Sequence, residues 1–286
     1  MLNGVMLLWF LLTAIAVVFV AIDIRHTPES PVLKWGFILL TAYTGPLGAF
    51  LYVLGCREPL PGLHEQYVAA RWRQVLGSTM HCVAGDGIGI LIGSVISSLL
   101  TLPHLADIGL EYVLGFGFGW TIFQALFMRD MAGGSYQRSL AGTFIPEFLS
   151  MNLLMTGMVP IAALGRILIG RPLSPLAPDF WFVMSMALLT GFIVAYPMNW
   201  WLVAKGLKHG MMTVRPREAA EAHGGATAMA MARSGPAPEM GSPRAHHIDH
   251  AAPPSRSQIA GIAVLSVAAF GLAIWLALAL DSVHPG

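Results

Sequence analysis

The sequence predicts an all-α, polytopic membrane helix bundle of about seven transmembrane helices. Hydrophobic residues make up 56% of the chain and charged residues 11%, whereas soluble domains average about 45–50% and about 25%. The mean hydropathy is +0.67. Apolar runs of about 20 residues, the length that a helix needs to cross the hydrocarbon layer, recur along the chain. A chain with so little polar surface cannot coat a soluble globule, so we expect an integral membrane protein.

Seven apolar runs have the length of a membrane span. They are residues 2–22, 32–54, 78–102, 109–128, 140–169, 178–204 and 259–280. The first run has no basic leader and no small-residue cleavage site, so we expect a retained span rather than a removed signal peptide. The fourth carries Gly115, Gly117 and Gly119, which weaken its helical signal.

The runs divide the chain into three predicted parts. Residues 1–212 form a six-helix transmembrane domain, 213–258 a linker, and 259–286 a C-terminal transmembrane helix. The linker is rich in Ala, Gly and Pro and has no apolar period, so we expect it to be disordered. The last span then resembles an appendage to a six-span unit.

Lys and Arg residues predict how the bundle is oriented. The loops at 55–77, 129–139 and 205–258 hold twelve of them, and the loops on the other side hold four. Because basic residues concentrate in cytoplasmic loops, we expect the first set inside, the N-terminus cytoplasmic, and the C-terminus periplasmic or extracellular. Lys205 and Lys208, which follow a Trp pair, look like an interface anchor at the cytoplasmic end of the sixth span.

The third span carries His81, Cys82 and Asp86 on one face. At about 100° per residue, these side chains occupy an arc of about 140°. The same arc holds a ladder of glycines at Gly85, Gly89 and Gly93. Such a ladder lets the backbone of a neighbouring helix come close, and an Asp in the bilayer costs roughly 2.5–3.5 kcal/mol. We therefore expect this face to point inward, although His81 and Cys82 could simply pack near the membrane surface.

The fifth span carries a second candidate face. Glu147, Met151, Met155 and Met158 are spaced by four, four and three residues, which places them within an arc of about 80°, with Asn152 at its edge. Thioether sulfur favours soft ions such as Cu(I). The alternative is that the methionines fill gaps in the core, as methionines commonly do.

Other spans contribute single candidates. Gln124 in the fourth span and Asn199 in the sixth would join Asp86, Glu147 and Asn152 in a substrate or proton pathway, and His209 would lie at the cytoplasmic mouth. The linker adds a weak candidate metal site at His246, His247, Asp249 and His250. Imidazole and carboxylate groups this close can hold a borderline divalent ion, or bind one only adventitiously.

Prolines interrupt three of the predicted spans, at Pro46, Pro160 and Pro197. Each deprives the carbonyl group four residues earlier of its donor and kinks the helix. Broken helices line substrate sites in transporters, but plain bends are the alternative.

Several classes of protein receive no support. The net charge of +1 gives no basic field for nucleic acid, and the two cysteines, Cys56 and Cys82, form no disulfide framework. The sequence has no GxSxG, HExxH or Walker motif, so no enzyme class is indicated.

Four motifs in order resemble a bacterial integral-membrane family that is catalogued only as a domain of unknown function. They are M-H-C-V-A-G-D, F-M-R-D-M-A-G-G-S-Y, P-E-F-L-S-M-N-L-L-M-T-G-M-V-P and A-Y-P-M-N-W-W-L-V-A-K-G-L-K-H-G-M-M. They cover about Ser78 to Met212, roughly half of the chain. The resemblance implies a multi-span protein of the bacterial inner membrane and supplies no activity or ligand.

Three functions remain open. The first is a transporter or membrane handler of a soft metal, Cu(I), with copper ligands among His81, Cys82, His209 and the methionine row. The second is proton-coupled transport of a small non-metal solute through Asp86 and Glu147, with the methionines as packing. The third is a non-transport assembly factor or membrane-embedded enzyme. The bilayer is the expected partner, together with a metal ion, a membrane protein or a second copy of the chain.

Overall fold

The computed structural model describes residues 2–60, 63–129, 134–171, 173–210 and 253–283, and within these ranges it contains helices and no strands. The α-helices are α1 (Leu2–Asp23), α2 (Pro31–Thr44), α3 (Pro46–Gly55), α4 (His64–Val68), α5 (Arg71–Leu100), α6 (His104–Gly117), α7 (Ala125–Met128), α8 (Tyr136–Ile169), α9 (Pro178–Ala204) and α11 (Arg256–Val283). A short 3₁₀ helix η1 (Ile24–His26) and a π-helix η2 (Phe118–Gln124) complete them. Most of the predicted linker, with its four candidate metal ligands, lies outside the described residues.

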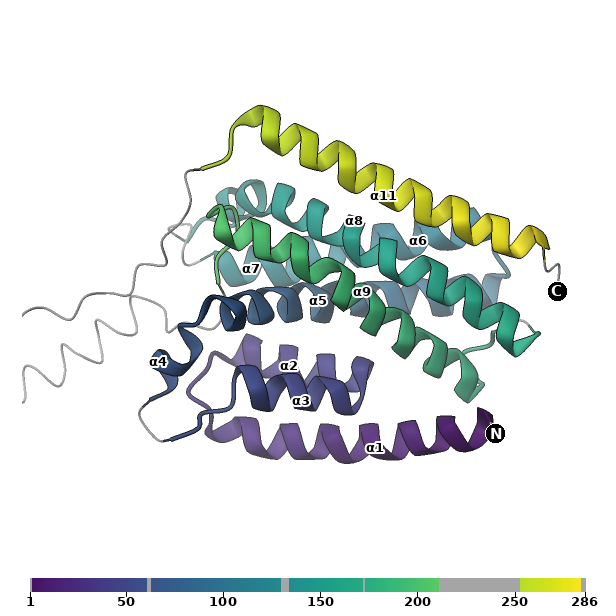
Figure 1. Cartoon of the computed structure of the whole chain (residues 1–286), viewed down its shortest axis with the longest axis horizontal. Coiled ribbons are helices and arrows are strands. Elements are labelled where there is room, and N and C mark those ends of the chain that lie inside the picture. Colours follow the sequence, from purple (N-terminus) through teal and green to yellow (C-terminus); the bar gives the residue numbers. More distant parts are fainter. Residues whose placement is uncertain (1, 61–62, 130–133, 172, 211–252, 284–286) are drawn as a thin grey trace, which may run out of the picture.

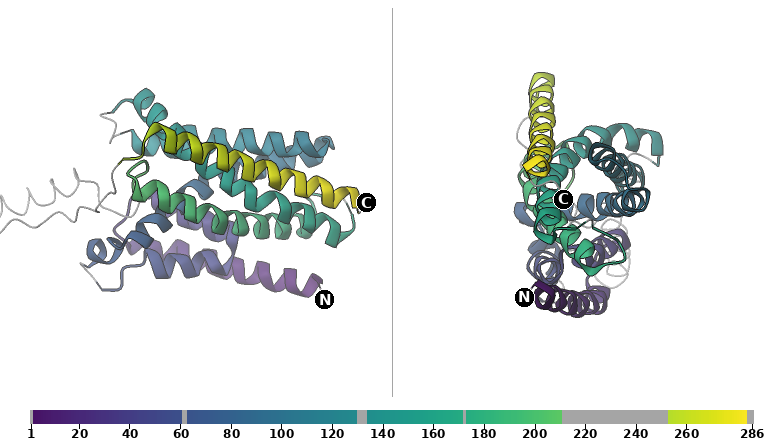
Figure 2. Two further views of the ribbon diagram at one scale, coloured as in Figure 1. Left: turned by 45° about the horizontal axis from the view of Figure 1, so that its top comes forward. Right: turned by 90° about the vertical axis from the view of Figure 1, so that its right-hand side faces the viewer.

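The elements form the helical membrane bundle that the sequence predicts. Five helices, α1, α5, α8, α9 and α11, are long and apolar enough to cross a membrane. A sixth segment is built from α6, η2 and α7, which follow one another without a break from His104 to Met128. Figures 1 and 2 show these six segments running alongside one another.

The predicted second span, residues 32–54, does not cross the bundle but forms a helical hairpin. The chain turns at Gly45, whose φ of 63° and ψ of −144° are open to glycine and strained for other residues. Pro46 then begins α3 and has no N–H to continue α2. Helices of 14 and 10 residues are each shorter than the roughly 20 residues that a span requires.

Side-chain contacts show that the hairpin returns to the end from which it entered. Tyr52 near the end of α3 shares a 3.0 Å hydrogen bond with Thr27, which lies just before α2. Its hydroxyl also donates to Asp23 at 2.8 Å, and Asp23 pairs with Arg57 at 2.9 Å. Figure 1 shows α2 and α3 side by side along part of α1. The sequence prediction failed here because one apolar run of this length suits a span and a hairpin equally.

The hairpin changes the predicted topology. Because residues 32–54 turn back, both described ends of the chain lie at the same end of the bundle (Figures 1 and 2). The sequence had predicted the two termini on opposite sides of the membrane. We call the end that carries both termini the terminal end. The other is the basic end, where η1, α4, the first turn of α8 and the described residues that follow α9 lie.

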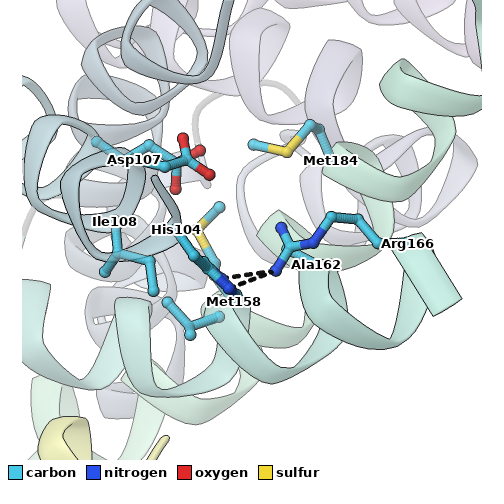
Figure 3. Close-up of a pocket in the computed structure, with 9 residues that line it drawn as sticks. His104, Asp107, Ile108, Met158, Ala162, Arg166 and Met184 are labelled. Atoms are coloured by element: carbon cyan, nitrogen blue, oxygen red, sulfur yellow. Dashed lines mark hydrogen bonds between the residues drawn. The ribbon is translucent and has the colours of Figure 1, made fainter. Parts of the chain in front are cut away.

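The C-terminal helix packs on the bundle along α8 rather than standing apart as an appendage (Figure 1). Asn152 of α8 donates to Ser266 of α11 at 3.0 Å. At the terminal end, Asp281 of α11 pairs with His104, and it lies 3.5 Å from Arg166 of α8. His104 and Arg166 also contact each other directly, as Figure 3 shows.

The glycine ladder of α5 accommodates the sixth segment at close range. A methyl group added at Gly93 would lie 2.9 Å from the Cα of Glu111, and one at Gly89 would overlap the carbonyl oxygen of Leu114. At Gly85 a methyl group would meet the Phe123 ring at 2.6 Å. The inward face of α5 therefore lies against α6 and η2.

Candidate functional site

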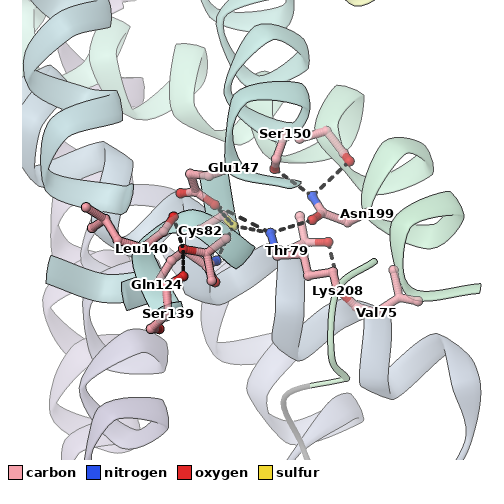
Figure 4. A network of polar contacts seen from close by, with 12 residues as sticks. Val75, Thr79, Cys82, Gln124, Ser139, Leu140, Glu147, Ser150, Asn199 and Lys208 are labelled. Carbon is pink, nitrogen blue, oxygen red and sulfur yellow. Dashed lines mark hydrogen bonds and ion pairs between the residues drawn. The ribbon is translucent and has the colours of Figure 1, made fainter. Parts of the chain in front are cut away.

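A network of buried polar side chains lies within the half of the bundle nearer the basic end (Figure 4). We call it the buried polar cluster; its members are Cys82 and Asp86 of α5, Gln124 of η2, Glu147 of α8, Asn199 of α9 and Lys208. None of the six is more than 5% exposed.

The Cys82 sulfur is the centre of this network. Its thiol donates to Oε2 of Glu147 at 3.0 Å, and Nε2 of Gln124 donates to the sulfur at 2.9 Å. The Lys208 ammonium contacts the same sulfur and lies 3.6 Å from Oε2 of Glu147. It also donates to Oδ1 of Asn199 at 2.9 Å, so residues 126 positions apart in sequence share one network.

The carboxyl groups of Asp86 and Glu147 face one another beside Gly119 of η2. A methyl group on Gly119 would overlap Oδ1 of Asp86 and would lie 2.7 Å from Oε1 of Glu147. Among the described residues, these two oxygens and Oδ2 of Asp86 have no other hydrogen-bond partner. Two carboxylates held this close inside a protein would repel each other strongly.

The π-helical turn of η2 positions two parts of this site. Its wider winding spans Phe118–Gln124, with Gly119 against the carboxyl pair and Gln124 against Cys82. The Trp120 indole fixes the segment to α8 by donating to the Leu140 carbonyl at 2.9 Å. Single π-helical turns inside α-helices occur often at functional sites.

Lys208 reaches the cluster because the chain folds back after α9. The helix ends at Ala204, and Gly206 has a φ of 68°. The N–H groups of Leu207 and Lys208 then both donate to the Leu202 carbonyl, at 3.0 and 3.2 Å. The prediction that Lys208 is an interface anchor is therefore wrong, since its side chain is 5% exposed.

The charges of the cluster can balance. Burial lowers the pKa of Lys208, but the neighbouring acidic groups of Cys82, Glu147 and Asp86 outweigh burial and hold the pKa above its ordinary value. The ammonium is therefore charged. If one proton is shared by the carboxyl pair and the Cys82 thiol keeps its own, the cluster carries one positive and one negative charge. Such pairing is what makes ionisable groups tolerable inside a membrane.

The structure brings some of the other predicted residues close to this site and separates others. His81 is fully buried one residue before Cys82, with its ring edge-on to Phe123 at 5.5 Å between centroids. Asn152 is turned away, because it accepts from Tyr112 at 2.8 Å and donates to α11. His209 is exposed at the basic end.

The methionine row does not gather around one point. Met151, Met155 and Met158 are all buried, but from the first to the third the helix rises by about 10 Å. Met151 lies near the carbonyl of Asp86, because a methyl group at Gly115 would contact both. Met158 instead lines a small cavity near the terminal end. Within the described ranges, no three His, Cys, Asp or Glu side chains are placed to hold a metal ion.

Sequence reasoning missed Lys208 and Gly119 as parts of the site. The glycines on either side of Lys208, Gly206 and Gly210, are a local signal that the chain turns there. No local pattern shows that this turn aims the side chain at Cys82. Gly119 was noted only as a weakness of the fourth span, and its role depends on two carboxyl groups from other helices.

Comparison with known families covers the part of the chain that builds this cluster. Residues 71–208 match the family model described as "Domain of unknown function (DUF4396)". The match begins at the first residue of α5 and ends at Lys208, so it includes every member of the buried polar cluster, while α1, the hairpin and α11 lie outside it. No significant match was found among curated proteins or among solved structures. The resemblance inferred from the four motifs is thus confirmed, because residues 71–208 match the model of the DUF4396 family.

Proposed function

We propose that this protein is a membrane transporter that couples the movement of a small polar solute to protons at Asp86 and Glu147. The supporting observation is the carboxyl pair itself, which is buried inside a membrane bundle and faces a single buried lysine. Ionisable groups in membrane spans are costly and mark ion and proton pathways.

The contacts of the cluster suggest how proton binding would be coupled to movement. Loss of the shared proton would leave the cluster with one excess negative charge, and a second proton would leave it with one excess positive charge. Either change alters the attraction between Glu147 and Lys208, now 3.6 Å apart. Lys208 belongs to the segment that folds back after α9. A weaker attraction between Lys208 and Glu147 would allow this segment to move away from the basic end of the site.

The orientation that we infer follows from the observed topology and the basic residues. With the hairpin turning back, ten of the twelve Lys and Arg residues that the structure describes lie toward the basic end. The two remaining ones are Arg166 and Arg171. The positive-inside rule then places the basic end in the cytoplasm and both termini on the outer side of the plasma membrane.

A solute screen in proteoliposomes tests this function. We would apply a proton gradient, add amino acids, sugars and organic acids as separate pools, and record proton movement with a trapped pH dye. We expect at least one pool to drive proton uptake that Asp86→Asn and Glu147→Gln each abolish. Glu58→Gln, a carboxyl change in a loop at the basic end, should retain it. A wild-type protein with no solute-dependent proton movement would overturn the proposal.

Transport of Cu(I) as the cargo is a second candidate, favoured by the central position of the Cys82 sulfur. Soft thiolate and thioether groups prefer Cu(I), and Met151 is the row member near Asp86. Copper would have to displace the Lys208 ammonium, which contacts that sulfur. Elemental analysis after loading with reduced copper would compare Cys82→Ser and Met151→Leu with Met158→Leu as the matched control. Equal copper content in all three variants and wild type would reject this candidate.

A further inference from the structure

A second buried carboxyl group lies near the terminal end, outside the buried polar cluster. Glu111 of α6 is 8% exposed, and its backbone lies against Gly93 of α5. The Ser94 hydroxyl of α5 lies beside this carboxyl group and donates to the Met184 sulfur at 3.7 Å. Glu111 lines a small cavity together with His104, Asp107, Arg166, Met158 and Met184 (Figure 3).

Ionisable side chains of α6 and α8 line this cavity together with Glu111, and Asp281 of α11 contacts two of them. His104 and Asp107 come from α6 itself, Arg166 from α8 and Asp281 from α11. Nη2 of Arg166 lies 2.6 Å from Nε2 of His104, and Asp281 pairs with both. From α9, the facing group is the uncharged Met184. Glu111 therefore shares its cavity with His104 and Arg166, which Asp281 pairs with.

An apolar layer separates Glu111 from the carboxyl pair. Along α5, Asp86 and Gly93 are seven residues apart, which corresponds to a rise of about 10 Å. The intervening level holds the close contact of Gly89 with the Leu114 backbone and the fully buried side chains of Ile90 and Met151. Direct proton transfer needs groups within hydrogen-bond reach or linked by one water, and the side chains of Ile90 and Met151 supply no such group.

Resting on the proposed function, we propose that Glu111 is a second proton-binding site, which exchanges protons with the terminal end of the bundle. The apolar layer is then the barrier that separates it from Asp86 and Glu147. Coupled transport requires that a proton never has an open path across the membrane. Two acidic sites on either side of a dry layer meet this requirement, because one site can load while the other is sealed.

Infrared spectroscopy of the full-length protein in lipid tests whether Glu111 binds protons. During a pH titration, each carboxyl group that gains a proton adds a C=O stretching band. We expect one band to be lost in Glu111→Gln alone and another to be lost in Asp86→Asn. An Asp23→Asn control, at an exposed ion pair outside both sites, should keep both bands. A titration that Glu111→Gln leaves unchanged would overturn the inference.

A second variant keeps the test decisive if Glu111→Gln does not fold. Ser94→Ala retains the carboxyl group but removes its hydroxyl neighbour, so it should shift the frequency of the Glu111 band and leave the Asp86 band in place. Identical spectra for Ser94→Ala and wild type would contradict the assignment.

Proton-coupled uptake in proteoliposomes separates this inference from the proposed function. If Asp86→Asn retains coupled uptake, the proposed function fails. A different pair of results would reject the Glu111 inference alone. In that case Asp86→Asn abolishes uptake, whereas the uptake by Glu111→Gln changes after a pH jump on either side as it does in the wild type. We expect that, after a pH jump on the terminal side, the change in the uptake rate is at least tenfold slower in Glu111→Gln than in the wild type.

Discussion

At the scale of single residues, Gly119 joins the packing of the bundle to its charge chemistry. The carboxyl oxygens of Asp86 and Glu147 occupy the space that any side chain at Gly119 would need. We predict that Gly119→Ala destabilises the protein by about 1–3 kcal/mol, as overpacking of a filled interior does, and impairs proton coupling. Thermal unfolding in mild detergent measures the first effect and proteoliposome uptake the second.

Gly117→Ala is the matched control for this change. Gly117 lies on the same segment, and a methyl group there would meet nothing within 4 Å. Because Ala is a better helix former than Gly by about 1 kcal/mol, this variant should be at least as stable as the wild type. Equal stability of the two variants would show that the carboxyl groups do not confine Gly119.

Lys208 provides a second prediction at this scale. Lys208→Met removes the cation of a buried pair and leaves Glu147 without its counter-charge, a change that costs about 3–5 kcal/mol. The double variant Lys208→Met with Glu147→Gln should recover part of that loss, because no uncompensated charge remains. Since the pKa of Lys208 is raised, its contribution should be complete at pH values below the ordinary lysine pKa and be lost as the pH rises from that value through the raised pKa.

The measurement is the unfolding midpoint of four proteins: the wild type, each single variant and the double variant. Lys205→Met, at the end of α9 and outside the buried polar cluster, is the control for loss of a basic residue. Additive losses in the double variant would mean that Lys208 and Glu147 do not interact.

At the scale of elements, the hairpin of α2 and α3 makes a prediction about sidedness. His26 and Leu60 are exposed and flank the hairpin. If the segment between them returns to its own side, His26→Cys and Leu60→Cys react with an impermeant maleimide from the same face of sealed vesicles. The native Cys56 and Cys82 are buried, so the unmodified protein provides the background. Labelling from opposite faces would mean that residues 32–54 cross the membrane.

The same elements show how far the sequence could lead. Long apolar runs predicted the crossing helices, and the positions of Asp86 and the glycines of α5 predicted its inward face, because both signals are local. The hairpin depends on the sign of φ at Gly45, which an apolar run does not encode. The pairing of Lys208 with Cys82 depends on helices distant in sequence. The spacing of the methionines indicated that they share one face of α8, but it did not indicate which residues of other helices lie opposite that face.

At the scale of the whole molecule, the two acidic sites and the basic end form an ordered series across the bundle. The carboxyl pair with Lys208 lies toward the basic end, and Glu111 with Arg166 lies toward the terminal end. Lys208 belongs to the first site, and Arg166 lines the cavity of the second, where it also lies 3.5 Å from Asp281. α11 lies outside the family match, but its Asp281 contacts the outer pair of His104 and Arg166. The helix added to the family domain thus contributes to the closure of the terminal end.

The placement of the chain's two ends is the prediction that tests this arrangement as a whole. Asn3 and Ser282 are both exposed at the terminal end. Because six segments cross and the hairpin does not, Asn3→Cys and Ser282→Cys should react with an impermeant maleimide from one face of sealed membranes, and His26→Cys and Leu60→Cys from the other. The positive-inside rule assigns the first face to the outside, so intact cells should label the first pair alone. Labelling of Asn3→Cys and Ser282→Cys from opposite faces would require seven crossings and would refute the topology on which the two-site scheme depends.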